Sequence, residues 1–340
     1  MSSKLDQVWS DDQLNRRQDA EFIARFLIGR SAELAKQGRQ KSYVLNLDAE
    51  WGHGKTFFLS RLKKQLELEG HIAVYVDAWR DDFGDDPLVA TMAAIDAEVK
   101  KFFKPAGTAA SAWDVTKKSA GKVATQVGKG LLMRGASLLI TSAGAAAVEA
   151  TLSAAGQPIV AADVQSAGED GAAIAVAAID AVMDKRSEEA VSEFAAMRSS
   201  IDFFRQNLSK FVEMMEGQEG RPAPFFVLID ELDRCRPLYS IAMLERIKHL
   251  FETPGVAFIV ATDSGQLVHS INAVYGQGFN SARYLRRFFD QTYLFDEPNV
   301  AEFVAYLLQR TPIDLEKVNS PMEGGKLEFI AEFFQRSKAD

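Results

Sequence analysis

The feature that most constrains the fold of this chain is a glycine-containing loop set between an apolar run and an amphipathic segment. The loop reads Ala49-Glu-Trp-Gly-His-Gly-Lys-Thr56. Residues 43–47, which precede it, predict a short strand, and residues 54–69 predict a helix. Such a loop presents backbone N–H groups to an anion, and the helix N-terminus that follows favours negative charge. The order strand, loop, helix therefore predicts a phosphate-binding loop.

The end of this loop carries the residue types that phosphate chemistry needs. We expect the Lys55 ammonium to reach the β- and γ-phosphates and the Thr56 hydroxyl to ligate Mg²⁺. The strict form of the pattern begins with glycine, and the looser form accepts the alanine found at Ala49. A surface turn with a chance Gly-Lys-Thr is the rival interpretation, against which the flanking strand and helix argue. The residues expected to hold the nucleotide are Ala49, Glu50, Trp51, Gly52, His53, Gly54, Lys55, Thr56 and Phe57.

A second motif follows the unbroken apolar run 225–229, which is typical of a strand buried on both faces of a parallel sheet. A carboxylate at the carboxyl end of such a strand lies where α/β sheets bind ligands. We expect Asp230 to hold Mg²⁺ through water and Glu231 to orient and deprotonate the attacking water. A strand that merely leaves into an acidic, solvated turn is the alternative. The phosphate-binding loop and this acidic motif occur together and in the expected order, each after a predicted strand, which argues against the solvated turn.

Two further segments are candidates for contact with the γ-phosphate. Run 256–261 predicts a strand that ends in Thr262-Asp263. We expect Asp263 to position water or an arginine, and a simple turn-forming role fits it equally well. Arg286 and Arg287, in an arginine-rich stretch, are the best candidates for a catalytic arginine reaching a neighbouring subunit's nucleotide. Surface arginines on an amphipathic helix are the alternative.

The alternation of strands and helices predicts an α/β fold of the P-loop NTPase type, with a mainly parallel sheet and helices on both faces. Residues 1–104 and 186–295 form its two parts. Between them, 105–185 is expected to be an Ala/Gly-rich helical insertion. The pattern beyond residue 290 is helical, and 296–340 is expected to be a C-terminal helical segment.

Composition narrows the function classes. The 340 residues carry a net charge of −8, which argues against broad, salt-driven binding of nucleic acid. The single cysteine, Cys235, excludes an internal disulfide framework, and the four histidines lack metal-ligand spacing. The first residues lack the apolar core of a secretory signal. We therefore expect a cytoplasmic protein.

The side chains around the motifs also have structural interpretations. Trp79 is expected to pack in the core and Trp51 to brace the phosphate loop. The acidic residues between 81 and 86 are expected to form a solvated turn. Cys235 is expected to be a buried, unreactive thiol.

Taken together, these residues resemble the KAP family of P-loop NTPases. Trp51 matches that family's loop tryptophan. The segment Asp77-Ala-Trp79 is similar to the family's Asn-Ala-Trp segment, with aspartate in place of asparagine. The segment Ile229-Asp-Glu-Leu-Asp-Arg-Cys235 is similar to its Asp-Asp-Leu-Asp-Arg-Cys signature. The resemblance covers about residues 11–300 and is patchy over 105–185.

The resemblance implies an ATPase that hydrolyses ATP with Mg²⁺ and drives a conformational or oligomeric switch. It implies ATP rather than GTP, a homo-oligomer or protein partner, and a setting in antiviral (phage) defence or membrane-linked signalling. A nucleotide-gated scaffold or effector with little turnover is the alternative, and a small-molecule kinase is less favoured.

Family members often carry transmembrane helices where this chain has its Ala/Gly-rich insertion. The apolar run 135–148 has 14 residues, fewer than the ~20 that a spanning helix needs. A water-exposed helical hairpin is the favoured interpretation. The alternative is a helix pair over 131–162 that meets the inner face of a membrane, with its lysine-rich flank on anionic lipid.

Overall fold

The protein is described from a computed structural model of the whole chain. The described residues are 2–39, 41–84, 86–102, 107–123, 192, 195–196, 198–217, 220–250 and 252–295. The chain divides into two compact units, Met1–Trp113 with Leu208–Asp340, and Asp114–Asn207. The segment 131–162, for which membrane contact was the alternative interpretation, and the predicted C-terminal helical segment 296–340 lie outside the described residues. Within the described residues, no helix is both long and apolar enough to cross a bilayer.

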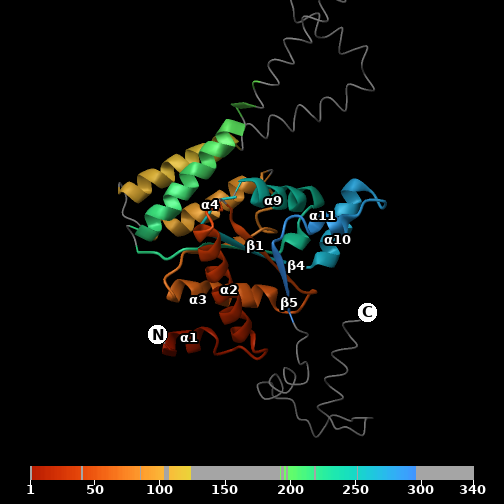
Figure 1. Ribbon diagram of the computed structural model, residues 1–340. Helices are drawn as coiled ribbons and strands as arrows, with labels where there is room; N and C mark the ends of the chain where they lie inside the picture. The colour runs from red at the N-terminus through yellow and green to blue at the C-terminus, as the bar shows by residue number, and fades with distance from the viewer. Residues whose placement is uncertain are drawn as a thin grey trace, which may run out of the picture. The chain divides into compact units, whose positions relative to one another are not determined.

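The first unit is an α/β fold, and the predicted strands at 43–47, 225–229 and 256–261 and the predicted helix at 54–69 are confirmed (Figure 1). The elements are α1 (Ser2–Val8), α2 (Arg16–Lys36), β1 (Tyr43–Asp48), α3 (Lys55–Leu68), β2 (Ala73–Asp77), α4 (Pro87–Val99), β3 (Phe225–Asp230), the 3₁₀ turn η1 (Leu232–Arg234), α9 (Pro237–Leu250), β4 (Val256–Thr262), α10 (Ser264–Tyr275), α11 (Ser281–Leu285) and β5 (Gln291–Leu294). Residues 108–123 are also helical, as are residues 198–217. Of the second unit, the structure describes chiefly the helical stretches 114–123 and 198–207.

The strands of the described residues form one parallel sheet in the order β2-β3-β4-β1-β5. Strand β4 therefore lies between β1, which leads into the phosphate loop, and β3, which carries the second motif. At the carboxyl ends, Asp48 pairs with Thr262 and Asp77 with Asp230. All the candidate motifs that follow strands consequently lie at one edge of the sheet, the edge at which α/β folds bind ligands.

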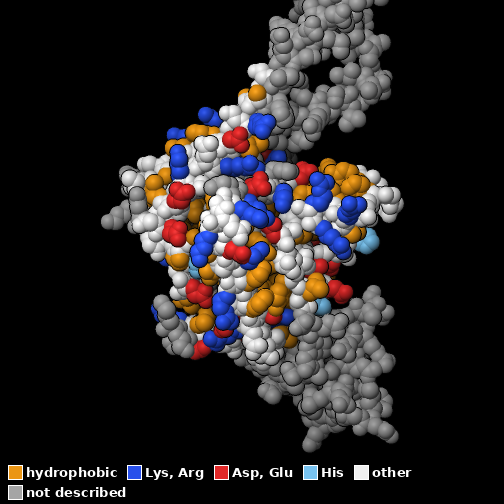
Figure 2. All heavy atoms as spheres, viewed as in Figure 1, with side chains coloured by type: hydrophobic (Ala, Val, Ile, Leu, Met, Phe, Trp, Pro, Cys, Tyr) orange, Lys and Arg blue, Asp and Glu red, His pale blue; other side chains and the backbone are white. Residues whose placement is uncertain are grey.

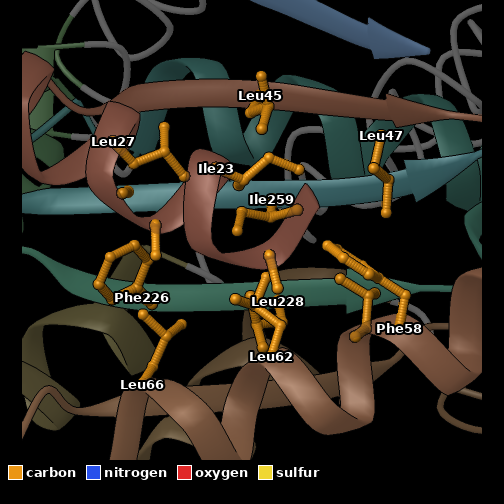
Figure 3. Packing of buried hydrophobic residues seen from close by; sticks show 14 of the residues in the cluster. Ile23, Leu27, Leu45, Leu47, Phe58, Leu62, Leu66, Phe226, Leu228 and Ile259 are labelled. Atoms are coloured by element: carbon orange, nitrogen blue, oxygen red, sulfur yellow. The ribbon is translucent and has the colours of Figure 1, made fainter. Parts of the chain in front are cut away.

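One face of the sheet packs against α2 and α3 (Figure 3). The side chains that meet there are buried and apolar, and they include Ile23 and Leu27 of α2, Phe58, Leu62 and Leu66 of α3, Leu45 and Leu47 of β1, Phe226 and Leu228 of β3, and Ile259 of β4. Burying each such side chain stabilises the fold by about 1.5–3 kcal/mol. This packing fixes α3, and with it the phosphate loop, against the sheet.

The alternate strand residues point to the opposite face of the sheet, since successive side chains in a strand alternate. Val227, Ile229 and Phe258 on that face are fully buried. Helices α4, α9 and α10 cover it (Figure 1). The expectation of a parallel sheet with helices on both faces is confirmed.

Strand β5 corrects the prediction that the chain is helical beyond residue 290. Residues Gln291–Leu294 form an edge strand that pairs with β1, from Leu45 opposite Gln291 to Asp48 opposite Leu294. Three of its four residues are exposed, so the strand has no alternating apolar pattern that a sequence could show. Residues 291–294 become a strand because they pair with the free edge of β1.

The acidic segment after β2 also differs from the predicted solvated turn. Asp82 is buried, and it accepts hydrogen bonds from the backbone N–H (2.7 Å) and Nε (2.9 Å) of Arg236. Asp86 caps α4 by accepting the N–H of Leu88 at 2.9 Å, and it pairs with Arg246 at 3.2 Å. These carboxylates fasten the segment to α9 instead of leaving it in solvent.

Candidate functional site

The loop between β1 and α3 has a backbone that only glycine adopts readily at two positions. Gly52 and Gly54 have φ of +83° and +81°, a region that residues with a Cβ rarely occupy. At the start of the loop, the N–H of Ala49 donates to Thr262 O (3.1 Å), and the Ala49 methyl is buried in the core cluster. Alanine is therefore accommodated there. Gly54 leads directly into the first turn of α3, which favours an anion.

Lys55 lies at the first position of α3 and is buried. Its Nζ donates to Ala49 O (2.5 Å) and to Glu50 O (3.3 Å), so the side chain folds back across the loop. Asp233 lies near enough for its pKa to respond to this lysine: burial raises the pKa of Asp233, and the Lys55 charge opposes that rise. The ammonium thus remains at the loop, where an anion would bind.

The two predicted motifs converge at the carboxyl edge of the sheet. The Thr56 hydroxyl lies 3.5 Å from Glu231 Oε1, at the long limit of a hydrogen bond. Asp230 is buried at the end of β3, where its Oδ1 accepts the N–H of Glu231 (2.9 Å) and its Oδ2 accepts the hydroxyl of Tyr75 (2.7 Å). Residues that are far apart in the sequence therefore share one site.

Glu231 has an unusual backbone and a perturbed carboxyl group. Its φ is +59°, uncommon for a residue other than glycine. Burial raises the pKa of Glu231, the neighbouring Arg234 lowers it, and the Asp230 charge raises it further. Arg234 Nη1 pairs with Glu231 Oε2 at 2.7 Å. The carboxyl group thus sits between the Thr56 hydroxyl and a guanidinium.

The expectation that Trp79 packs in the core is wrong, since 54% of its surface is exposed. Strand β2 ends at Asp77, and the turn that follows carries the indole past the edge of the sheet. There Arg234 Cζ lies 5.5 Å from the Trp79 ring centroid and 4.7 Å from that of Trp51. The two tryptophans flank the site rather than the core.

The residues at this edge fit Mg²⁺. Mg²⁺ prefers oxygen ligands and is usually held by one or two side chains together with water and phosphate oxygens. The Thr56 hydroxyl and the Asp230 carboxylate are such ligands, and each carboxylate oxygen keeps a second lone pair beside the hydrogen bond it accepts. Among the described residues, no three His, Cys, Asp or Glu side chains form a metal cage. The donor set therefore suits a cation that arrives with a nucleotide.

Other candidates lie close to the loop but make structural contacts. Asp263 caps α10, because its Oδ1 accepts the N–H of Gln266 at 3.1 Å. Phe57 is half-buried against the core cluster, with the Arg61 guanidinium 3.5 Å from its ring centroid. The N–H of His53 donates within the loop, to Glu50 O at 3.5 Å.

Arg286 and Arg287 are not brought to the phosphate loop of their own chain. Both are exposed and follow α11, shortly before Asp290. The N–H of Asp290 donates to Val44 O (2.8 Å), near the amino end of β1. Val44 is about 17 Å along β1 from the start of the loop, so the two arginines, which precede Asp290, lie toward the opposite edge of the sheet.

Two side chains that contact the site, Arg234 and Tyr75, were not among the predicted site residues. Arg234 was visible inside the second motif, and its charge next to an acidic pair was the signal that could have identified it. Tyr75 gave no signal, because only the pairing of β2 with β3 brings its hydroxyl to Asp230.

Comparison with protein families gives a match to the KAP family P-loop domain over residues 27–291. Comparison with curated proteins gives no match. The matched segment contains the phosphate loop, the second motif, strands β1 to β4 and the first residue of β5. Membership of such a family implies a nucleotide ligand. Because the match spans well over half of the chain, this protein belongs to the KAP family of P-loop NTPases.

Proposed function

We propose that this protein is an ATPase that cleaves the β–γ bond of ATP with Mg²⁺ and uses the reaction to switch conformation or oligomeric state. The observation that carries the proposal is the meeting of Thr56 with the Asp230–Glu231 pair, at 3.5 Å between Thr56 Oγ1 and Glu231 Oε1. Phosphoryl transfer asks a protein mainly for positioning and charge neutralisation. This edge of the sheet offers the groups for both.

In this proposal the loop amides and Lys55 bind the β- and γ-phosphates, with Trp51 bracing the loop. Thr56 and Asp230 hold the metal, and Mg²⁺ supplies positive charge to the phosphate oxygens when it is bound. Lys55 Nζ would exchange the loop carbonyls that it contacts for phosphate oxygens. Tyr75 and the Glu231 N–H keep the Asp230 carboxylate in one orientation.

Glu231 is the proposed general base. Its carboxylate orients the attacking water and accepts the water proton on an Oε atom. Burial raises the pKa of this carboxyl group, which makes it a better proton acceptor than an exposed glutamate. Asp263, which caps α10 beside this site, holds the end of β4 in place.

The test is Mg²⁺-dependent phosphate release from ATP by the wild type and two variants. Lys55→Ala should lose nucleotide binding and turnover. Glu231→Gln should keep nucleotide affinity while turnover falls by about 10²–10⁴-fold, and Glu33→Gln on α2 is the matched control that should change neither. If the wild type releases no more phosphate than Lys55→Ala does, the protein is not an ATPase.

The location of Arg286 and Arg287 supports a role between subunits. Because they lie away from their own loop, we propose that they reach the γ-phosphate in a neighbouring copy within a homo-oligomer. Size measured with and without ATP, together with restored activity on mixing Arg286→Ala/Arg287→Ala subunits with Glu231→Gln subunits, tests this. Activity of the arginine variant equal to that of the wild type would contradict it.

The same location also favours a second candidate, a nucleotide-gated scaffold or effector with little turnover. An isolated chain lacks an arginine from this segment at its own loop, so hydrolysis would be slow. An ATP-dependent change of size or partner binding that persists in Glu231→Gln, with negligible phosphate release by the wild type, would favour the scaffold over the ATPase.

The biological setting is inferred from the family resemblance: antiviral defence against phage, or signalling at the inner face of a membrane. Plating phage on cells that express the wild type or Lys55→Ala tests the first setting. Flotation of the full chain with anionic vesicles tests the second.

A further inference from the structure

Three segments that are distant in the sequence meet at one guanidinium. Arg234 follows β3, Trp51 belongs to the phosphate loop, and Trp79 lies in the turn after β2. The Arg234 Cζ atom is 4.7 Å from the Trp51 ring centroid and 5.5 Å from the Trp79 ring centroid. The same side chain pairs with Glu231 through Nη1 and Oε2 at 2.7 Å. Arg234 thus joins two exposed indoles to the proposed general base.

Burial in the hydrophobic core does not explain the place of the two indoles. Trp51 and Trp79 are 66% and 54% exposed, although each is large and apolar. A guanidinium is planar and weakly hydrated, so it stacks well on aromatic faces. An exposed arginine otherwise has many rotamers, and contact with two rings restricts them. The rings therefore fix the position of the Arg234 guanidinium.

Glu231 needs such a restraint more than most carboxylates do. Its backbone is in the left-handed region, with φ of +59°, and its Oε1 has only a long contact to Thr56. Asp77, Asp230 and Asp233 surround it with like charge. The pair with Arg234 is the short contact that gives the Glu231 carboxylate one orientation.

We propose that Arg234 is a positioning residue for Glu231, and that Trp51 and Trp79 act on turnover through it. The inference rests on the proposed function, in which Glu231 orients and deprotonates the attacking water. It predicts that loss of either tryptophan contact lets the carboxylate move away from the water, and a misplacement of about 1 Å is enough to cost up to 100-fold in rate. Trp79 gives the cleaner test, because Trp51 is itself part of the phosphate loop.

The first experiment compares Trp79→Ala with Trp79→Phe and with Phe83→Ala. Phe83 lies in the same turn and is 89% exposed, so it is another exposed aromatic side chain close to Trp79 in the sequence. Trp79→Ala should lower kcat by about tenfold, while ATP affinity stays within about twofold. Trp79→Phe keeps an aromatic face and should recover most of the loss. Phe83→Ala should leave both quantities unchanged.

The second experiment is a double-mutant cycle. Arg234→Ala should lower kcat at least as much as Trp79→Ala, and Arg234→Lys should recover only part of it, because an ammonium lacks the planar fork. If Trp79 acts through Arg234, the double variant should be no slower than Arg234→Ala alone. If the fold-losses in kcat of the two single variants multiply in the double variant, the proposal is overturned.

A readout without nucleotide accompanies the cycle. The falls in Tm caused by Arg234→Ala and Trp79→Ala should be less than additive in the nucleotide-free protein, since either change removes the same contact. Additive falls would overturn the contact itself. This measurement also decides the matter if the kcat of Arg234→Ala is too low to quantify.

The outcomes separate this inference from the function on which it rests. Phosphate release by the wild type no higher than that of Lys55→Ala would overturn both. Lys55-dependent release together with a Trp79→Ala kcat equal to that of Phe83→Ala would overturn only the role of Arg234. A weaker ATP affinity with unchanged kcat in Trp79→Ala would also overturn it, because the indole would then act on the nucleotide directly.

Discussion

The interior of the sheet and its carboxyl edge contain different kinds of residue a few ångströms apart. The interior of β3 is a run of buried apolar side chains, which pack against apolar neighbours on both faces of the sheet. At the next residues, Asp230 is a buried carboxylate, Glu231 has a positive φ, and Trp79 is exposed. The residues of the interior are those that stabilise a fold. The residues at the carboxyl edge include a buried charge, a strained backbone and an exposed aromatic ring, each of which costs stability. Departures of this kind concentrate where a protein binds or reacts.

The largest effect that would sharpen this comparison is expected at Asp230. Asp230→Asn should lower Mg²⁺-dependent turnover on the order of 100-fold or more, because the carboxylate charge proposed to hold the metal is lost. It should also cost about 1–3 kcal/mol of unfolding free energy, since the amide nitrogen cannot accept the second of the two hydrogen bonds that Asp230 now accepts. Phosphate release and urea unfolding measure the two quantities.

Tyr75→Phe is the matched control for that variant. It removes a hydrogen bond to Asp230 and keeps the carboxylate, so it should share part of the stability loss and little of the loss of turnover. Equal turnover losses in the two variants would contradict the metal role of Asp230.

An interior substitution should have the opposite profile. Leu62→Ala removes a fully buried side chain of α3 and should lower the unfolding free energy by about 2–5 kcal/mol. Leu294→Ala, at a leucine that is 68% exposed on β5, should change it by no more than about 0.5 kcal/mol. Both variants should retain kcat under conditions in which they are folded. Similar unfolding midpoints for the two would break the comparison.

The phosphate loop should respond to a single methyl group. Gly54 has φ of +81°, and a Cβ there would meet no atom within 4 Å, so Gly54→Ala introduces backbone strain without a clash. We expect a cost of about 1–2 kcal/mol and weaker nucleotide binding. Gly29→Ala, also without a neighbour within 4 Å but inside α2, should instead stabilise the protein by about 0.5–1 kcal/mol. Thermal unfolding and nucleotide titration measure both.

The last prediction concerns the reactivity of Cys235, for which we expect no effect on turnover or stability to be needed as a readout. Burial raises the pKa of this thiol, and the carboxylates of Asp82 and Asp233 raise it further. Little thiolate therefore exists at pH 8, and Cys235 should react with iodoacetamide far more slowly in the folded protein than in urea. Equal rates in the two states would show that the turn after β3 opens readily.

The same contrast explains how much the sequence could predict. Three buried strands, β1, β3 and β4, and helix α3 were predictable, because each burial requirement leaves a local apolar pattern. Strand β5 was not, since it is exposed and depends on the edge of β1. At the site, Lys55, Thr56, Asp230 and Glu231 were visible as two motifs in order. The contacts of Trp79, Arg234 and Tyr75 depend on which strands are neighbours, and no local pattern encodes that.

The place of β4 has one more consequence. Because β4 separates β1 from β3, the two strands that carry the motifs stand two strand spacings apart, about 9.5 Å. Hydrogen bonds of the sheet set this width, and the side-chain bonds of Asn46 with Thr262 (2.7 Å) and Ser264 (3.0 Å) tie β1 to the end of β4. Under the proposed function, a triphosphate with its cation would therefore meet a gap of fixed width, and any movement that follows hydrolysis would come from the loops and helices above it.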